Sequence, residues 1–365
     1  AAVLAEYNQP LEIREMPIPE LEPGALLVRV DAATICGTDV HISHGQLTQF
    51  SKLPLIMGHE IVGTIVALRG REKDAADQPL REGDQIVWAY PWCGECYWCT
   101  IARQPTLCPN AQMYGWGPCD KPPYLLGGLA DYAYVRPKCH VLKVPEGLDP
   151  AVVAAATCSL RTVVHGFERL GMLGGIGIQE TTVIMGCGPV GLWALALSVV
   201  SGAAKTIVIG APTRRLQVAK KWGADVTIDL EEISDPDKRQ EIILGLTEGR
   251  GADLVIECAG PAAAFQEGLE LVRRGGRVLV IGSTDPNPIT IHPTAFNLKM
   301  ISVVGLLSGA IPHYYKALQF LKNNWQRFPF TDMISNVYSL DQVNQALKSM
   351  DAFQEVKPAI LPGGK

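Results

Sequence analysis

Two short segments near the start of the sequence carry residues that bind metal ions. Cys36 offers a thiolate, and the neighbouring pair His59 and Glu60 offers an imidazole and a carboxylate. Zinc takes these donors, and a catalytic zinc site uses three protein ligands and leaves one position for a substrate. We expect Cys36 and His59 to bind zinc together with Cys158, which lies on a predicted helix at a domain junction. Glu60 is expected to bind transiently or to tune the site.

A zinc ion with an open position makes a bound alcohol acidic, as it does a bound water. Thr38 is expected to take the alcohol proton, and His41, near solvent, to accept it in the end. Asp39 is placed to accept the second ring N–H of His59 and so to fix its tautomer. Taken singly, these residues also fit a buried structural cysteine, a core histidine and a surface histidine. Their combination favours a metal site.

A second group of cysteines indicates a structural metal site. The spacing is Cys93-x2-Cys96-x2-Cys99-x8-Cys108. Four thiolates fill a tetrahedral zinc and leave no open position, so this ion is expected to stabilise a loop and to do no chemistry. An iron–sulfur cluster is the alternative, but nothing else in the sequence indicates electron transfer. The cysteines outside both groups are interpreted as structural or incidental: Cys119, Cys139, Cys187 and Cys258.

A glycine-rich segment in the middle of the chain is typical of dinucleotide binding. It lies between an apolar strand, Thr182 to Met185, and an apolar helix, Leu192 to Val200, which is the context that such a motif requires. Gly188 is expected to let the backbone approach a pyrophosphate, and Gly191 to allow close packing of helix and strand. The alternative is a glycine cluster that serves packing only. The predicted binding residues are Gly186, Gly188, Pro189, Val190 and Gly191.

The end of the second predicted strand bears on the choice between NAD and NADP. NAD sites carry an acid about 20 residues past the glycine motif, but no acid occurs between residues 181 and 224. The strand ends at Gly210, and the following Thr213, Arg214 and Arg215 can hold a 2′-phosphate. We therefore expect a preference for NADP. The alternative is that the arginines are a solvated helix start and that both cofactors bind.

The 365 residues suffice for two domains with full cores. The first part alternates short apolar runs with proline and glycine, as strand-rich domains do. From Thr182 onward strands alternate with helices, which is typical of a doubly wound parallel sheet. The segment after Gly305 is too short for a third core and is expected to rejoin the first domain. The predicted fold class is α/β, with a β-rich first domain and a doubly wound parallel sheet in the second.

Charge and hydropathy argue against several partners. The formal net charge of −5 disfavours a polyanion such as nucleic acid. No apolar run reaches the roughly 18 residues that a membrane span needs, and the first ten residues lack the features of a signal peptide. The cysteine spacing favours metal binding in a reduced compartment. We therefore expect a cytoplasmic protein that acts on a small molecule, without nucleic acid or membrane partners.

These motifs together resemble the zinc-containing alcohol dehydrogenases of the medium-chain dehydrogenase/reductase superfamily, over essentially the whole chain. The resemblance implies a GroES-like catalytic domain at residues 1–156 with a structural-zinc lobe at about 91–110, a Rossmann domain at 157–300, and a return to the catalytic domain at 301–365. It also implies two zinc ions per chain, NAD or NADP as cofactor, and a homodimer or homotetramer. Backbone positions implied to bind the nicotinamide carboxamide are Ile281, Ser283, Leu306 and Ser308.

Two other functions fit parts of the sequence. A zinc-free quinone or enoyl reductase of the same fold needs no ligand set, so Cys36, His59 and Cys158 argue against it. A non-enzymatic zinc-binding protein that meets a partner through the cysteine lobe is disfavoured by the net acidity and by the lack of a basic stripe. The expected pocket is mostly apolar, which predicts a small to medium alcohol and its aldehyde or ketone as substrates.

Overall fold

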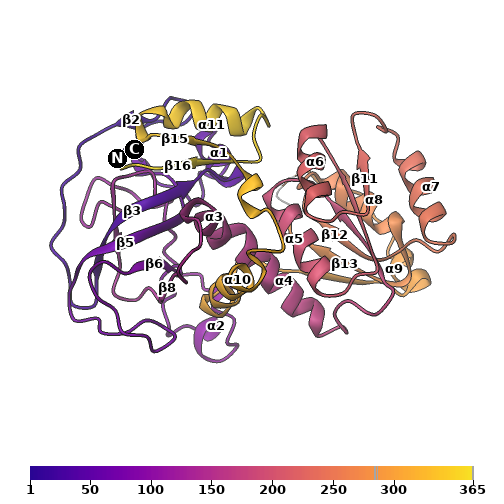
Figure 1. Cartoon of the computed structure of the whole chain (residues 1–365), viewed down its shortest axis with the longest axis horizontal. Coiled ribbons are helices and arrows are strands. Elements are labelled where there is room, and N and C mark those ends of the chain that lie inside the picture. The colour runs from indigo at the N-terminus through magenta and orange to yellow at the C-terminus, as the bar shows by residue number, and fades with distance from the viewer. Residues whose placement is uncertain (283–284, 286, 364–365) are drawn as a thin grey trace. The chain divides into compact units, whose positions relative to one another are not determined.

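The computed structural model describes residues 1–282, 285 and 287–363 and consists of two compact units (Figure 1). The first unit comprises Ala1–Arg161, Gly309–Trp325 and Phe330–Lys365, and the second comprises Thr162–Ser308 and Gln326–Pro329. The sequence-based boundaries lie earlier, after residues 156 and 300. The first difference has a simple cause: the chain changes units inside a continuous helical run, where no break in the pattern marks the change.

A seven-stranded, mainly antiparallel sheet forms the centre of the first unit. Its longest strands, β3 (Leu26–Thr34) and β5 (Glu60–Leu68), pair antiparallel, and buried residues dominate both. The strand order is β15-β16-β3-β5-β6-β8, with β7 paired to β3. The other strands are β6 (Gln85–Trp88), β7 (Tyr132–Val135), β8 (Val141–Lys143), β15 (Ile334–Tyr338) and β16 (Lys357–Ile360).

Short elements complete the first unit around one apolar core. A small sheet of order β2-β1-β4 contains β1 (Ala2–Leu4), β2 (Glu12–Ile13) and β4 (Leu55–Ile56). The α-helices are α1 (Gly37–Ser43), α2 (Tyr97–Thr100), α3 (Pro150–Ala155), α10 (Ile311–Asn324) and α11 (Val343–Asp351). Short turns of helix are η1 (Pro105–Leu107), η2 (Ala156–Leu160), η3 (Phe330–Met333) and η4 (Leu340–Gln342). Strand β16 pairs with β3, so the C-terminal segment belongs to this unit.

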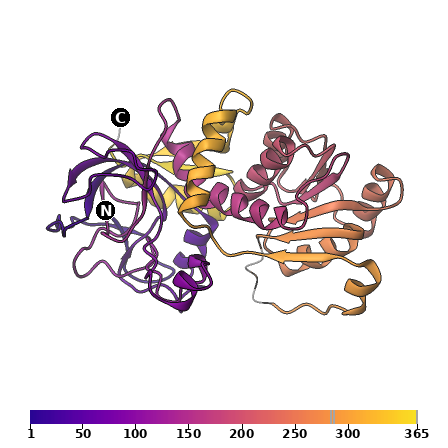
Figure 2. The same ribbon diagram turned by 90° about the horizontal axis from the view of Figure 1, so that it is seen from below.

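The second unit is a six-stranded parallel sheet of order β11-β10-β9-β12-β13-β14. The chain starts in the middle and reverses direction between β9 and β12, which is the doubly wound order of dinucleotide-binding folds. Helices cover both faces of the sheet (Figure 2), so its central strands are apolar on both sides. The strands are β9 (Thr181–Met185), β10 (Lys205–Gly210), β11 (Val226–Asp229), β12 (Ala252–Glu257), β13 (Val272–Val280) and β14 (Ser302–Gly305).

The helices of the second unit pack on an aliphatic core with an aromatic pair at one side. Trp193 and Trp222 are fully buried, with ring centroids 5.1 Å apart. The helices are α4 (Arg161–Gly171), α5 (Pro189–Val200), α6 (Thr213–Lys221), α7 (Pro236–Leu246), α8 (Ala262–Leu271) and α9 (Thr294–Lys299). The predicted α/β class, with a strand-rich part and a doubly wound sheet, is confirmed.

Within the described part of the chain, no helix combines the length and the apolar character that a membrane crossing requires.

Candidate active site

The structure brings together four predicted ligands that are distant in sequence. Donor atoms of Cys36, His59, Glu60 and Cys158 all lie within 4.8 Å of one another. Around a tetrahedral zinc, donors with bonds of about 2.0–2.3 Å lie about 3.3–3.8 Å apart, so the cluster has the size of a metal site. Two thiols, an imidazole and a carboxylate are also the donor chemistry that zinc prefers. The residues therefore fit the predicted catalytic ion.

Local backbone structure positions each ligand. Cys36 is the residue before α1, and His59 directly precedes β5, which begins at Glu60. Cys158 lies in a single π-helical turn, η2, between α3 and α4. Such turns widen a helix locally and occur often at functional sites. The hydroxyl of Ser159 donates to the carbonyl of Ala155 at 2.8 Å within the same turn.

Asp39 ties the two N-terminal ligand segments together from a fully buried position. Its carboxylate accepts the backbone N–H of Cys36 at 2.8 Å and that of Gly58 at 3.3 Å. The same carboxylate lies 3.3 Å from Nδ1 of His59, but the pair is not aligned as a hydrogen bond. Asp39 thus occupies the expected place, and its control of the His59 tautomer stays a prediction. With Nδ1 turned toward Asp39, we expect Nε2 to be the ligand.

The pKa values of the two site cysteines are shifted in opposite directions. A hydrogen bond from Cys158 lowers the pKa of Cys36 well below its ordinary value, whereas the same contact raises the pKa of Cys158. Lys357 adds a positive charge that also lowers the pKa of Cys36. The site therefore favours a thiolate at Cys36, which is the form that binds metal.

Glu60 has a partner that the sequence did not reveal. Lys357, on β16, lies 2.6 Å and 2.8 Å from its two carboxylate oxygens, and the hydroxyl of Thr34 donates to the carboxylate as well. Burial raises the pKa of Glu60 to about 7, although Lys357 opposes this shift. Because Lys357 is almost 300 residues away in the sequence, only the pairing of β16 with β3 brings it here.

The predicted proton relay lies on one face of α1. The Oγ1 atom of Thr38 is 3.8 Å from the sulfur of Cys36. His41 follows one helical turn later, which places it beside Thr38 on the helix surface. Nδ1 of His41 contacts the side-chain oxygen of Gln46. Thr38 and His41 are both partly exposed, as a path from the ligand cluster to solvent needs.

Arg161, three residues after Cys158, is a buried cation that the sequence did not reveal. The Arg161 side chain is 2 % exposed, and its Nε donates to the carbonyl of Thr157 at 2.8 Å. Its guanidinium carbon lies 5.4 Å and 5.3 Å from the ring centroids of Tyr90 and Tyr314. A lone arginine in a sequence carries no signal of burial, so this cluster could be found only in the structure.

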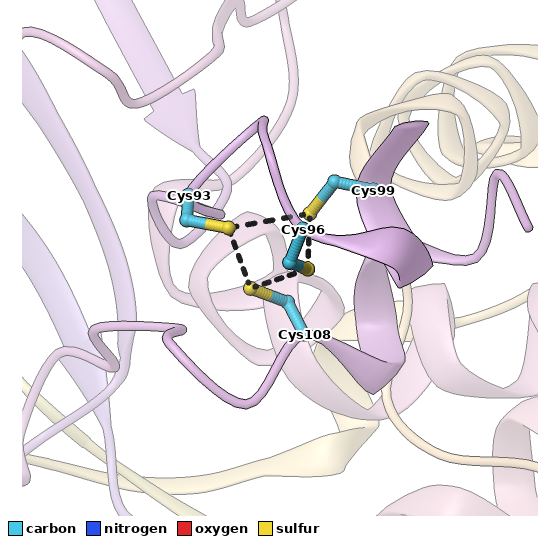
Figure 3. A group of neighbouring side chains, drawn as sticks. All are labelled: Cys93, Cys96, Cys99 and Cys108. Carbon is cyan, nitrogen blue, oxygen red and sulfur yellow. Dashed lines mark hydrogen bonds between the residues drawn. The ribbon is translucent and has the colours of Figure 1, made fainter. Parts of the chain in front are cut away.

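The four-cysteine lobe has the geometry of a closed zinc site. The four sulfur atoms face one another (Figure 3). The sulfur–sulfur distances are 3.4 Å for Cys93–Cys108, 3.6 Å for Cys96–Cys99, 3.8 Å for Cys96–Cys108 and 3.9 Å for Cys93–Cys99. Four sulfurs bound at about 2.3 Å to a tetrahedral zinc lie about 3.8 Å apart. A backbone hydrogen bond from Glu95 lowers the pKa of Cys93 to about 6, which favours the thiolate. The predicted set of four fits the ion.

The glycine motif forms the loop between β9 and α5, where only glycine fits at two positions. Gly186 has φ = +107°, and a Cβ on Gly191 would lie 1.9 Å from the carbonyl oxygen of Gly186. Gly188 is the residue before α5, and Pro189 is its first residue, where a missing N–H costs nothing. Val190 follows in the first helical turn. The free N–H groups of this helix start suit a pyrophosphate.

The segment after β10 differs from the expectation in one respect. A Cβ on Gly210 would lie 2.5 Å from the sulfur of Cys187, so no acid fits there. However, Asp229 at the end of β11 is in register with Gly210 and accepts the hydroxyl of Thr213 at 2.6 Å. The sequence lacks an acid on β10, but the neighbouring strand supplies one. The motif rule could not find it, because the rule looks only along one strand.

Two of the remaining cofactor positions meet around α4. A Cβ on Gly166 would lie 3.2 Å from a methyl carbon of Leu306 and 3.5 Å from one of Ile281. The carbonyl oxygen of Ser308 faces Nδ1 of His165 at 2.9 Å, a contact that the sequence did not suggest. The predicted position Ser283 lies outside the described residues. The roles of Ile281, Leu306 and Ser308 toward a cofactor stay predictions.

Comparison with known proteins agrees with this architecture. The family model for the alcohol dehydrogenase GroES-like domain matches residues 22–146, and the model for zinc-binding dehydrogenase matches residues 189–323. The 5-exo-hydroxycamphor dehydrogenase of Pseudomonas putida is 35 % identical, over 99 % of this chain and 98 % of that protein.

Two solved structures are similar over nearly their whole length. An alcohol dehydrogenase from Thermotoga maritima has a TM-score of 0.93 at 34 % identity, covering 99 % of this chain and 98 % of that one. A proposed zinc-binding dehydrogenase from Sinorhizobium meliloti 1021, bound to NADP, has a TM-score of 0.83 at 28 % identity, with the same coverage.

A GroES-like unit with two metal-ligand clusters and a doubly wound unit with a glycine loop define a zinc-dependent oxidoreductase of the dinucleotide-binding class. The chain belongs to the zinc-containing alcohol dehydrogenases of the medium-chain dehydrogenase/reductase superfamily. The predicted resemblance is thereby confirmed.

Proposed function

We propose that the chain transfers hydride between an alcohol and its aldehyde or ketone, with NAD or NADP as the second substrate. The observation that carries the proposal is the convergence of Cys36, His59 and Cys158 within 4.8 Å. A zinc-free reductase of this fold binds no catalytic metal, so it would not need two thiols and an imidazole at one place. A non-enzymatic zinc protein would need only the four-cysteine lobe.

Each residue of the cluster has a proposed role. A zinc ion held by Cys36, His59 and Cys158 supplies the Lewis acidity that makes an alcohol hydroxyl acidic at neutral pH. Thr38 accepts the proton of that hydroxyl and passes it toward His41 and solvent. Lys357 and Thr34 hold the Glu60 carboxylate, which keeps it available as an alternative ligand without committing it to the metal.

The proposed cofactor is a nicotinamide dinucleotide bound at the glycine loop of the second unit. The NADP in the Sinorhizobium relative supports this class of cofactor. The preference for NADP that Gly210, Arg214 and Arg215 suggest takes no account of Asp229, the acid on the neighbouring strand β11. For the substrate, the name of the Pseudomonas relative suggests that alicyclic secondary alcohols belong in the test panel beside primary alcohols and polyols.

The Cys158→Ala variant tests the catalytic metal site. We expect turnover to fall by more than about 100-fold, because removing a ligand exceeds the effect of removing its supporting residues. Zinc content should fall from two ions to one per chain. The affinity for the dinucleotide should stay nearly constant, because the glycine loop lies in the other unit.

Cys119→Ala is the matched control, since Cys119 is a buried cysteine outside both ligand sets. The control should keep both zinc ions and full turnover. Undiminished turnover in Cys158→Ala would show that the third ligand is wrongly assigned. A wild-type protein with one zinc ion and no stabilisation by NAD or NADP would favour the non-enzymatic alternative.

A further inference from the structure

The carboxyl edge of the parallel sheet holds an acid in an unexpected place. Gly210 ends β10, and Asp229 ends the adjacent β11 in register with it. In-register residues of neighbouring parallel strands project to the same face of a sheet. Asp229 therefore extends to the side on which a residue at position 210 would carry its own side chain. That space is partly filled by the sulfur of Cys187, which excludes an acid at position 210 itself.

Asp229 controls the only proton of the Thr213 hydroxyl. That hydroxyl lies 2.6 Å from Oδ2 of Asp229 and 3.4 Å from a carboxylate oxygen of Glu231. A hydroxyl carries one hydrogen, so Thr213 is left with lone pairs that accept hydrogen bonds. Thr213 is an exposed residue at the start of α6, where a cofactor can reach it.

This arrangement distinguishes the two nicotinamide cofactors. The ribose 2′-hydroxyl of NAD has a proton to donate to Thr213. A 2′-phosphate has only acceptor oxygens and carries close to two negative charges. It would meet an oxygen without a free proton, beside two carboxylates whose combined charge exceeds that of the exposed Arg214 next to Thr213. Like charges at close range disfavour a partner strongly.

Arg215 does not offset this effect. Its side chain is buried, and its Nη1 atom lies 3.9 Å from the place of a Cβ on Gly188. Gly188 is the glycine that a pyrophosphate approaches, and the pyrophosphate is common to NAD and NADP. The position of Arg215 therefore suits binding of either cofactor and does not select between them.

We propose that Asp229 is the specificity-determining residue of the cofactor site and that, through Thr213 and its own charge, it selects NAD over NADP. The inference rests on the proposed function, since it assumes that the second unit binds a nicotinamide dinucleotide. It revises the preference for NADP that the sequence suggests, because the acid missing from β10 is supplied by β11.

The test is the ratio of the dissociation constants for NAD and NADP, measured by titration calorimetry on the full chain. Wild type should bind NAD more tightly. Asp229→Asn keeps the shape and an acceptor oxygen but removes the charge, so the preference for NAD should shrink by at least about tenfold through tighter NADP binding. Glu232→Gln is the matched control: this exposed acid lies in the same loop, and its removal should leave the ratio unchanged.

Thr213→Val provides a second variant that does not depend on the folding of Asp229→Asn. It should weaken NAD several-fold and leave NADP unaffected, because only NAD uses the hydroxyl. A wild-type preference for NADP, an unchanged ratio in Asp229→Asn, or equal weakening of both cofactors would overturn the assignment. Binding of neither cofactor to wild type would overturn the proposed function and the inference with it.

Discussion

At the residue scale, the pair of Lys357 and Glu60 shows how the site handles a buried charge. Both side chains are nearly inaccessible, at 1 % and 0 % exposure. Desolvating two ions costs several kcal/mol each, and only close pairing offsets this cost. Thr34 adds a further hydrogen bond to the carboxylate. The positive charge of Lys357 therefore offsets the electrostatic repulsion between the Glu60 carboxylate and a neighbouring cysteine thiolate.

We expect Lys357→Met to lower the free energy of unfolding by about 3–5 kcal/mol, because it leaves a buried carboxylate without its counter-charge. The double variant Glu60→Gln/Lys357→Met should recover much of this loss. Urea denaturation of the zinc-loaded proteins measures both values. Lys143→Met is the control, since Lys143 is 27 % exposed in its pair with Asp84 and should cost about 1 kcal/mol or less. Equal losses at both lysines would contradict this view of the pair.

At the element scale, the cysteine lobe is the segment that we expect to depend most on a metal ion. Its two helical pieces, α2 and η1, have four and three residues and contain no buried side chain. Helices this short are not stable by themselves. An ion bound by the four cysteines would therefore provide the main constraint on the lobe.

Cys96→Ser should reduce the zinc content from two ions to one per chain and open the lobe to proteases, because the ion loses one of its four ligands. Metal analysis and limited proteolysis with mass spectrometry measure the two effects. Cleavage should concentrate between residues 91 and 110. Cys119→Ala should show neither change. If Cys96→Ser kept two zinc ions and its protease resistance, the lobe would not be a zinc site.

At the scale of the whole molecule, the parallel sheet of the second unit ends in an open edge. Within the described chain β14 pairs only with β13, and unpaired edges recruit further strands. Exposed apolar side chains lie in β14 and in the few residues before and after it: Leu298, Met300, Val303 and Leu307. We propose that two copies of the chain associate along β14, in line with the homodimer or homotetramer that the resemblance implies.

Light scattering should then give a mass of at least twice the chain mass of 39.5 kDa. Val303→Lys places a charge in the proposed contact and should shift the protein to monomers. Val337→Lys is the control, since Val337 is also exposed on an edge strand, β15, at 57 % against 39 % for Val303. The other exposed residues of β15, Ser335 and Asn336, are polar. A monomeric wild type, or equal effects of both variants, would exclude association at β14.

The class of protein could be predicted from the sequence because its signals are local. The four cysteines of the lobe lie within 16 consecutive residues, and the glycine motif spans six. Backbone connectivity alone keeps such residues near one another, so their spacing translates directly into geometry. The alternation of apolar strands and helices predicted the doubly wound sheet in the same way, because each apolar run corresponds to one strand or helix and is local in the sequence.

The tertiary structure decided which distant residues act on these motifs. Lys357 reaches Glu60 because β16 joins the sheet beside β3, and Asp229 reaches Thr213 because β11 lies next to β10. Arg161 becomes a buried cation only when Tyr90 and Tyr314 enclose it. Strand order and packing depend on the free energy of the whole core, so no single segment of the sequence determines them. The charge balance at Glu60 and the proposed cofactor selectivity therefore depend on the fold. The residue types and spacing of the two predicted ligand sets could be read from the sequence, but only the fold brings Cys36, His59 and Cys158 together.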